Sequence, residues 1–424
     1  MSRPDVTLVS AYPPPGDLHG GSSGVASYTA NLARALADHG LDVAVVAPHE
    51  SPEDPSVHHD GDVTVHRSGP RGRTALGDAT RRAAELGGAV THVQHEWFLW
   101  GGPSSIPDTF RGLAQLRRRS AAPTVATMHQ VVRRGVVDRA FTEVHGLPAV
   151  PQLVGPGFQA LQRSLATQVD HVLVHEPAFT EAIPGAQVVP HGLEPGSPVT
   201  REQARRDLGL PEDALVALNF GFVAPYKGLD VALGGIEAAG PDVLGVVAGG
   251  AHPRHGDGML RHLEARFGHT ARFTGFVPDD DVTRWFRASD VALLLYPRPH
   301  ASSGVLALAL ANDCPALLSP GLAETVDAPD VLRVDQDPVA VARALRRLAD
   351  DPVHAHHART AGRRLAQGRD WPAVAATHAA AYEETRHAHR TARRRLRPGQ
   401  SGGRGPAVRV RPGDGRVGAV RDHG

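Results

Sequence analysis

The sequence is poor in several residue types, and each shortage excludes a class of protein. A single cysteine, Cys314, stands in 424 residues. It excludes an internal disulfide and a cysteine-based metal cage, and it fits a reducing compartment. Aromatic residues make up only 5%, so the core must be built from Ala, Val and Leu. No apolar run reaches the roughly 18 residues that a membrane span needs, and segment 1–8 has no secretory signal pattern. We expect a cytoplasmic globular protein with at most a peripheral contact at the inner face of a membrane.

Lysine is almost absent as well. The chain has 45 basic residues, of which only Lys227 is a lysine. It follows the apolar stretch 215–220 and precedes Gly228, so it lies near the carboxyl end of an expected strand, where open α/β sheets bind ligands. Lysine presents a compact ammonium with three donors, whereas arginine presents a rigid planar fork. The alternative is that one codon escaped the arginine bias and that Lys227 is a solvated loop charge.

The formal net charge of zero hides an asymmetry. Segment 387–424 holds ten arginines and two aspartates, a balance of +8, so residues 1–386 carry −8. This segment is rich in Gly, Pro and Arg and has no apolar period, which predicts disorder. It could lie on anionic lipid or nucleic acid, or be a solvated extension without function; no sequence-specific nucleic-acid binding is expected.

Strand and helix signals alternate along both halves of the chain. In the first half we expect a helix at 25–39 and strands at 6–10, 43–47, 90–93, 124–128, 172–174 and 188–189. After a polar connection, 194–208, we expect strands at 215–220, 243–248, 271–273, 291–295 and 315–318, and helices at 229–239, 258–267, 280–288, 304–312, 338–349 and 372–387. Such alternation predicts parallel, doubly wound sheets. We therefore predict two similar α/β domains with ligands bound in the cleft between them.

Three loops of small residues stand between a strand and a helix: 20–24, the loop with Lys227 and Gly228, and 298–304. Free backbone N–H groups and a helix N-terminus together attract anions. Each loop alone is weak evidence, because small residues before helices are usually caps and turns. Two such loops in one half, with Lys227 and Arg298 as cations, favour a diphosphate site.

Histidines end three of the expected strands. His129 follows 124–128, His95 with Glu96 follows 90–93, and His191 follows 188–189. Strand ends that open into a cleft are where ligand-contacting groups are expected. The alternative for any one of 25 histidines is a surface or packing role.

Together these segments resemble the family 4 glycosyltransferases of the GT-B fold over about residues 5–386. The likeness rests on the order and spacing of short stretches rather than on any one of them. The stretches are Gly20-Gly21, Gln94-His95-Glu96 with Gly101-Gly102, 125–129, 189–192, 220–228, 273–276 before 290–291, 296–304 and Pro315. The resemblance implies a Rossmann-like acceptor domain over 1–192, a Rossmann-like nucleotide-sugar domain over 193–370, a helix at 371–386 that crosses back to the first domain, and a disordered tail at 387–424.

The resemblance also implies roles for single residues. Lys227 would neutralise the donor diphosphate, together with the start of the 304 helix. His129 would contact the transferring sugar or the reacting centre, Glu324 falls near an acidic position of the family, and His95, Glu96 and His191 would face the acceptor. The other donor-binding positions are Gly20, Gly21, Ser302, Ser303, Gly304 and Val305.

Two positions depart from the family pattern. Phe222 stands where the family has an arginine, and we expect Arg298 to replace that charge. The family's paired glutamates fall at His300 and Leu308. Segment 302–306 instead resembles a subset in which a Ser-Gly pair holds the phosphate, so an activity is still expected.

The implied activity is retaining transfer of a hexose, of mannose or glucose type, from a nucleoside diphosphate sugar to a hydroxyl of a glycan, glycolipid or small molecule, as in polysaccharide biosynthesis. No metal or other cofactor is expected, because Asp279-Asp280-Asp281 fits a helix start better than a metal motif. The alternatives are a non-catalytic sugar-nucleotide-binding or partner subunit and a GT-B sugar-nucleotide epimerase. The basic helix 111–119 is expected to be a solvated face rather than a membrane contact.

Overall fold

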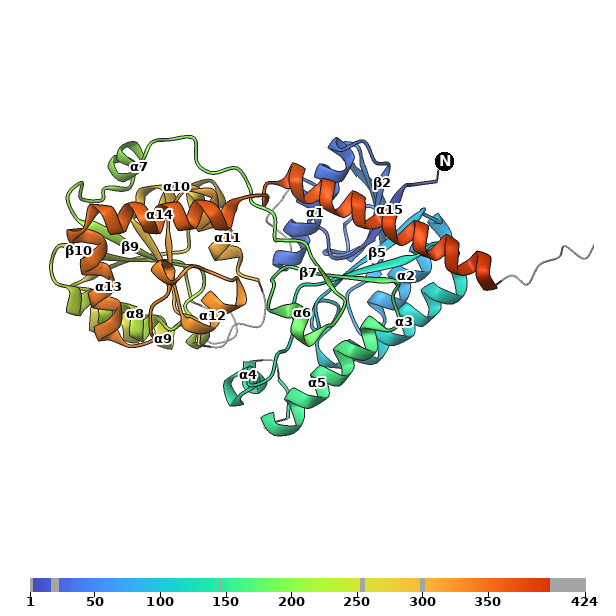
Figure 1. The fold of residues 1–424 in the computed structure, drawn as a ribbon, viewed down its shortest axis with the longest axis horizontal. Coiled ribbons are helices and arrows are strands. Elements are labelled where there is room, and N and C mark those ends of the chain that lie inside the picture. The colour runs from blue at the N-terminus through green and yellow to red at the C-terminus, as the bar shows by residue number, and fades with distance from the viewer. Residues whose placement is uncertain are drawn as a thin grey trace, which may run out of the picture.

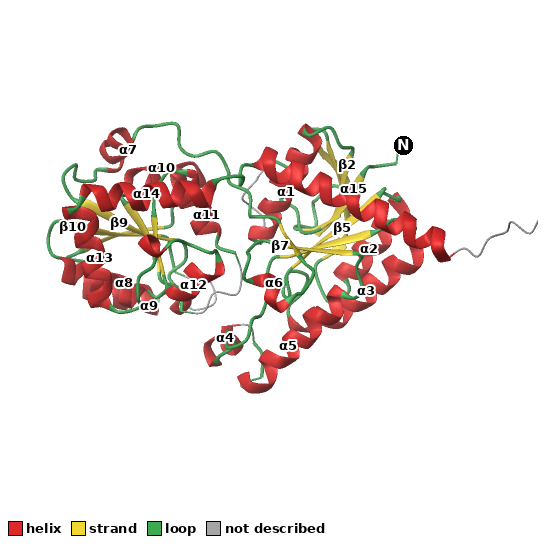
Figure 2. Cartoon of the chain, viewed as in Figure 1, coloured by secondary structure: helices red, strands yellow, loops and turns green. Residues whose placement is uncertain are grey.

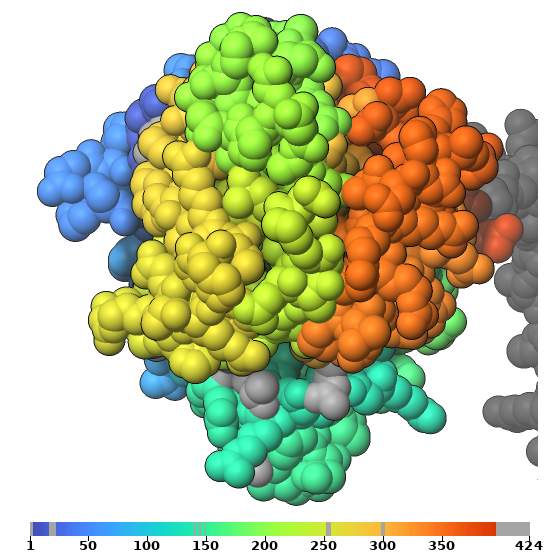
Figure 3. All heavy atoms as spheres, turned by 90° about the vertical axis from the view of Figure 1, so that its left-hand side faces the viewer, coloured from blue at the N-terminus to red at the C-terminus, as the bar shows by residue number. Residues whose placement is uncertain are grey.

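The structure, a computed structural model, describes residues 3–16, 23–144, 146–148, 150–251, 256–297 and 302–396. They form two lobes, each a twisted sheet with helices on both faces (Figure 1, Figure 2). Seen from the end of the C-terminal lobe, the region of α4 and α5 extends beyond that lobe's outline (Figure 3). Within these residues no helix is both long and apolar enough to cross a membrane.

The N-terminal lobe contains an eight-stranded sheet in the order β3-β4-β2-β1-β5-β6-β7-β8. Its strands are β1 Val6–Val9, β2 Val43–His49, β3 Val57–Asp60, β4 Val63–Pro70, β5 Val90–His95, β6 Thr124–Met128, β7 His171–Val174 and β8 Gln187–Val188. All neighbours run parallel except β3 and β4. This hairpin at the sheet edge was not predicted from the sequence.

The helices of this lobe are α1 Gly24–Asp38, α2 Ala75–Leu86, α3 Ile106–Arg119, α4 Arg139–Val144, α5 Pro151–Ala166 and α6 Phe179–Ala182. The predicted helical spacing of α1 is confirmed, since Tyr28, Leu32 and Leu36 all lie on its buried face.

The C-terminal lobe contains a fully parallel sheet in the order β11-β10-β9-β12-β13. Its strands are β9 Leu215–Phe220, β10 Val243–Ala248, β11 Ala271–Gly275, β12 Val291–Leu294 and β13 Ala316–Leu318. The chain winds outward from β9 in one direction and from β12 in the other. The point between β9 and β12 is therefore a topological switch point, like that between β1 and β5 in the first lobe, and such points bind ligands in open α/β sheets.

Eight helices of the C-terminal lobe lie in the described part of the chain: α7 Arg201–Leu208, α8 Leu229–Ala239, α9 Gly258–Phe267, α10 Asp279–Ala288, α11 Gly304–Ala311, α12 Pro320–Thr325, α13 Pro338–Asp350 and α14 Pro352–Ala366. Three of them, α7, α12 and α14, were not anticipated. The expected polar connection 194–208 ends in α7, which Thr200 caps by accepting from the backbone N–H of Gln203. Asp351 caps α14 in the same way.

The last helix, α15 Trp371–Leu396, crosses from the C-terminal lobe over the N-terminal lobe, as expected (Figure 1). Val374, Ala375 and Tyr382 pack into the core beside β1 and α1. The expected boundary of the tail at 387 was wrong, because the helix continues to residue 396. Arginines fill its last turn, and cations stabilise the negative end of a helix dipole.

Two chain crossings join the lobes. Leu193 on the first donates its N–H to the carbonyl of Arg369 on the second, at 2.7 Å. Gly192 packs so tightly on Trp371 that an added Cβ would lie 2.6 Å from the indole ring. The hinge between the lobes is therefore closely packed, and a glycine is required there by space.

Candidate active site in the interlobe cleft

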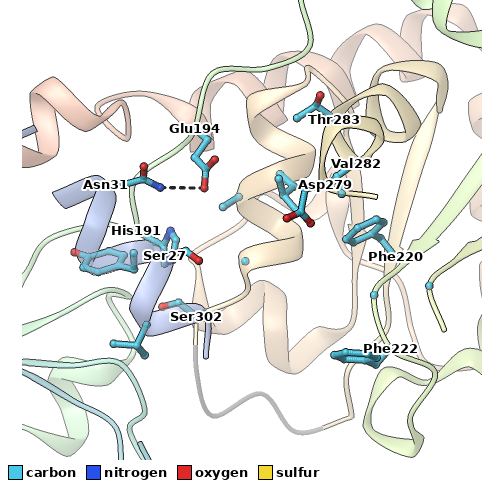
Figure 4. A pocket seen from close by; sticks show the side chains of 18 of the residues that line it. Ser27, Asn31, His191, Glu194, Phe220, Phe222, Asp279, Val282, Thr283 and Ser302 are labelled. Atoms are coloured by element: carbon cyan, nitrogen blue, oxygen red, sulfur yellow. Dashed lines mark hydrogen bonds between the residues drawn. The ribbon is translucent and has the colours of Figure 1, made fainter. Parts of the chain in front are cut away.

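A cavity of about 530 Å³ lies between the lobes and is lined by both. Asn31, Glu194 and His191 stand on one side of it, and Phe220, Phe222 and Asp279 on the other (Figure 4). The lining includes residues that follow β5 and β9, so both topological switch points open into one space. Clefts of this size and position are the usual places for small-molecule sites.

Two carboxylates of the cavity stand on the acceptor side. Glu96 follows β5 and is largely buried, and burial raises the pKa of its carboxyl. Its side chain has no hydrogen-bond or ion-pair partner within the described segments. Glu194, on the first chain crossing, accepts a 3.0 Å hydrogen bond from Asn31 of α1.

His129 follows β6 and lines the cavity, as the sequence predicted for a strand-end group. Its Nδ1 lies 3.1 Å from Nε2 of His175, whose Nδ1 lies 2.9 Å from the carbonyl of Val189. Burial lowers the pKa of His175 to about 3 and holds the pKa of His129 well below its ordinary value. Both rings are therefore neutral near pH 7.

The hydrogen bonds fix the tautomers of this pair. The Val189 carbonyl only accepts, so His175 carries its proton on Nδ1 and accepts at Nε2 from His129 Nδ1–H. Nε2 of His129 is then unprotonated and lies 2.8 Å from Oε1 of Gln94. Because both atoms are acceptors, this tautomer requires the Gln94 amide to be turned by 180°. The nitrogen and oxygen ends of such an amide have the same shape, and the nitrogen end fits this acceptor. Sequence reasoning did not single out His175, although it also follows a strand.

The three acceptor-side residues that the sequence selected are not equivalent. Glu96 and His191 line the cavity. His95, in contrast, lies behind the wall: it is 1% exposed, and its ring packs edge-on against Trp97 at 4.7 Å. Neither ring nitrogen has a partner in the described part of the protein, and burial lowers the pKa of His95 to about 3. The side chains of β5 alternate between the two faces of the sheet, so neighbouring strand-end residues face different surroundings.

Lys227 does not line the cavity; it lies in the short turn that follows β9, behind the lining residue Gly221. Its Nζ donates to the carbonyl of Phe220 at 2.9 Å, stands 3.4 Å from Tyr296 Oη and lies 5.3 Å from the centre of that ring. Gly221 lines the cavity and stands between it and the Lys227 ammonium, since a Cβ on Gly221 would be 3.1 Å from Nζ. A role for the ammonium towards a diphosphate stays a prediction.

The start of α11 forms another part of the wall. Ser302 and Gly304 line the cavity, and so do Ala307 and Leu308. The Ser303 hydroxyl caps the helix by accepting from the N–H of Leu306 at 3.2 Å. Val305 is partly buried against the core. Four expected positions lie outside the described residues: Gly20, Gly21, Arg298 and His300.

Glu324, expected near the donor, does not line the cavity. It is 67% exposed and pairs with Arg133 of the N-terminal lobe at 3.2 Å, while the same arginine donates to Thr325 at 2.7 Å. This corner of α12 therefore makes a contact between the lobes. Because successive residues of a helix point in different directions, a side chain only a few positions away from the family's acidic position faces away from the cleft.

No group of three or more His, Cys, Asp or Glu side chains in the described segments is placed to hold a metal ion. The three aspartates at 279–281 form the first turn of α10, where acidic residues complement the helix dipole. Metal independence stays a prediction that needs a direct test.

Comparisons with known proteins agree with this architecture. Residues 23–193 match the glycosyl transferase 4-like domain. The D-inositol 3-phosphate glycosyltransferase of Streptomyces avermitilis is 33% identical over 45% of this chain and 44% of its own. The 2-deoxystreptamine glucosyltransferase of Streptomyces kanamyceticus is 30% identical over 39% of this chain and 46% of its own. The chain thus spans less than half the length of these two curated relatives.

Solved structures extend the likeness to nearly the whole chain at the level of fold. Sucrose-phosphate synthase from Thermosynechococcus elongatus superposes with a TM-score of 0.67 at 20% identity, over 90% of this chain and 99% of its own. Anabaena HepE in complex with UDP-glucose gives a TM-score of 0.63 at 14% identity, over 90% and 100%. The protein therefore has the GT-B fold, with two Rossmann-like domains facing across a cleft.

Proposed function

We propose that this protein is a retaining glycosyltransferase of the family 4 type, in the subset with a Ser-Gly pair in place of the paired glutamates. It moves a hexose, of mannose or glucose type, from a nucleoside diphosphate sugar to an acceptor hydroxyl. The observation that carries the proposal is that one cavity joins the switch points of both Rossmann-like lobes. A donor in one lobe and an acceptor in the other would meet there, with water displaced between them.

The donor side offers suitable chemistry for a nucleotide. Phe222 and Phe276 line the cavity with exposed fractions of 47% and 78%, and exposed aromatic rings stack on nucleobases. Lys227, next to the lining residue Gly221, and the backbone N–H groups at the start of α11 are suited to a diphosphate. In HepE the corresponding fold holds UDP and UDP-glucose, which supports the same ligand class here.

In the proposed reaction the acceptor oxygen attacks the anomeric carbon as the bond to the diphosphate breaks. The proton of the acceptor hydroxyl passes to the leaving phosphate oxygen, and the sugar keeps its anomeric configuration. Lys227 and the α11 amides stabilise the charge that develops on the leaving group, with Arg298 as the second cation. His129 is neutral and held by His175, so it serves as a hydrogen-bonding group to the sugar rather than as a charge.

One observation favours a second candidate, a non-catalytic sugar-nucleotide-binding subunit. Leu308 lines the cavity at the position of a family glutamate, so an apolar side chain replaces the group that holds the ribose. Such a protein would bind nucleotide sugars without turning them over. The two candidates differ in turnover and not in binding.

A thermal-shift screen against nucleoside diphosphates and their sugars tests the proposal first, because a ligand of the folded state raises its apparent stability. The stabilising sugar nucleotide is then incubated with the protein, with and without hydroxyl acceptors, and release of the nucleoside diphosphate is followed. We expect one base to stand out and slow donor hydrolysis to occur without acceptor. Tight binding with no release on any donor would favour the non-catalytic candidate.

A further inference from the structure

The acceptor half of the cavity carries negative charge, and this indicates the class of acceptor. We infer that the acceptor is a cationic amino polyol, such as an aminocyclitol or amino sugar, and not a sugar phosphate. The inference rests on the proposed glycosyl transfer and assigns its acceptor. Its basis is the pair of charged groups on the acceptor side of the described cavity, Glu96 and Glu194, with no lysine or arginine among the described lining residues. Asp279 lines the opposite side.

A phosphate-bearing acceptor needs cations or several N–H donors, since arginine and lysine are the usual partners of phosphate. The two arginines whose charges act on Glu194 and His191 already have carboxylate partners. The positive charge of Arg34 interacts with Glu194. Its guanidinium also donates to both carboxylate oxygens of Asp60, and the shortest of these contacts is 2.8 Å. Arg369, near His191, lies 3.6 Å from the buried carboxylate of Glu176.

The histidines of the wall do not supply positive charge either. Burial lowers the pKa of His129, His175 and His191, so these rings are neutral near pH 7. Segment 17–22, outside the described residues, contains no lysine or arginine in its sequence. The N-terminal half of the site thus offers carboxylates and neutral hydrogen-bonding groups.

One largely buried acidic group of the same wall lacks a partner, and it suits an amine-bearing polyol. The Glu96 carboxylate is unpartnered within the described segments, and a buried charge without a counter-ion is unfavourable. A ligand ammonium would supply the counter-charge for Glu96, and ligand hydroxyls would pair with Asn31 and Glu194, which already share a hydrogen bond.

The test compares three acceptors of similar shape with the donor found by the thermal-shift screen: 2-deoxystreptamine, myo-inositol and inositol 3-phosphate. We expect transfer to the amine at a kcat/KM at least tenfold above that for the phosphate. Glu96→Gln and Glu194→Gln, which keep size and shape, should each lower the amine-to-inositol ratio of kcat/KM about tenfold. Glu181→Gln, an exposed residue of α6 away from the cavity, is the matched control and should leave the ratio unchanged.

The possible failures are distinct. Preference for inositol 3-phosphate, or a ratio that neither glutamine variant changes, overturns the amine acceptor. Donor hydrolysis without transfer to any amine overturns it too, while leaving glycosyl-donor chemistry intact. Absence of donor turnover overturns the proposed function alone, and calorimetric binding of 2-deoxystreptamine then decides the inference: binding that weakens in both glutamine variants supports the acidic site, and no binding refutes it.

Discussion

Replacing His95 by leucine should make the protein more resistant to acid. His95 is 1% exposed, has no partner for either ring nitrogen within the described segments, and has its pKa lowered by burial to about 3. The native state therefore binds no proton at this ring, whereas the unfolded chain takes one up below about pH 6.5. Native stability is full above that pH and falls as the pH decreases from about 6.5 towards about 3.

The magnitude follows from the proton taken up by the unfolded chain. Between pH 7.5 and 5.5 each histidine that stays neutral in the native state costs about 1.4 kcal/mol of unfolding free energy. Four other fully buried histidines share this behaviour: His92, His129, His175 and His378. Together the five amount to at most about 7 kcal/mol, comparable to the whole stability of an ordinary domain. Glu96 and Glu176, whose pKa values burial raises, offset part of this loss by binding protons in the native state.

The assay is urea unfolding of wild type and His95→Leu at pH 7.5 and 5.5, followed by fluorescence and circular dichroism. The variant's advantage should be about 1.4 kcal/mol larger at pH 5.5 than at pH 7.5. His262→Leu, on the exposed side of α9, is the matched control, because that ring meets solvent in the folded and unfolded chain alike. An equal difference between His95→Leu and wild type at both pH values would refute the neutral, buried state of His95.

Three further predictions concern the donor site, the hinge and metal ions. Lys227→Met should weaken nucleoside diphosphate binding by about 10- to 150-fold, as for loss of one charge-assisted hydrogen bond, and Arg298→Ala nearly as much; an unchanged Kd by calorimetry would contradict either role. Gly192→Ala forces a Cβ to within 2.6 Å of the Trp371 ring and should cost about 1–3 kcal/mol, seen as a lower Tm, whereas Gly258→Ala enters open space and should not. Added EDTA should leave donor turnover unchanged, and its loss would show that a metal is required.

Local patterns in the sequence were enough to predict most of the strands and helices of the fold. β9, β10, α8 and α9 have the predicted bounds, because apolar periodicity and helix-stop glycines act over a few residues. The β3–β4 hairpin, α7, α12 and α14 were missed. The hairpin's strand β3 is mostly exposed, so it lacks the buried apolar run by which the other strands were recognised, and α7 is short and strongly polar in sequence.

The candidate site was predictable only in part. The rule that ligand groups follow strands correctly selected Glu96, His129 and His191 for the cavity, but it also selected His95, which packs behind the wall against Trp97. It gave no reason to choose Asn31, which lies within a helix and reaches Glu194 across 163 positions of sequence.

The sequence by itself thus determined two Rossmann-like lobes and the strand ends that open between them, because these depend on local hydrogen bonding and on the period of apolar side chains. The tertiary structure alone decided which side chains face the cleft, which histidines stay neutral, and which carboxylate remains without a counter-ion. Those properties depend on burial and on charges brought together from distant parts of the chain, as when Arg133 of one lobe pairs with Glu324 of the other.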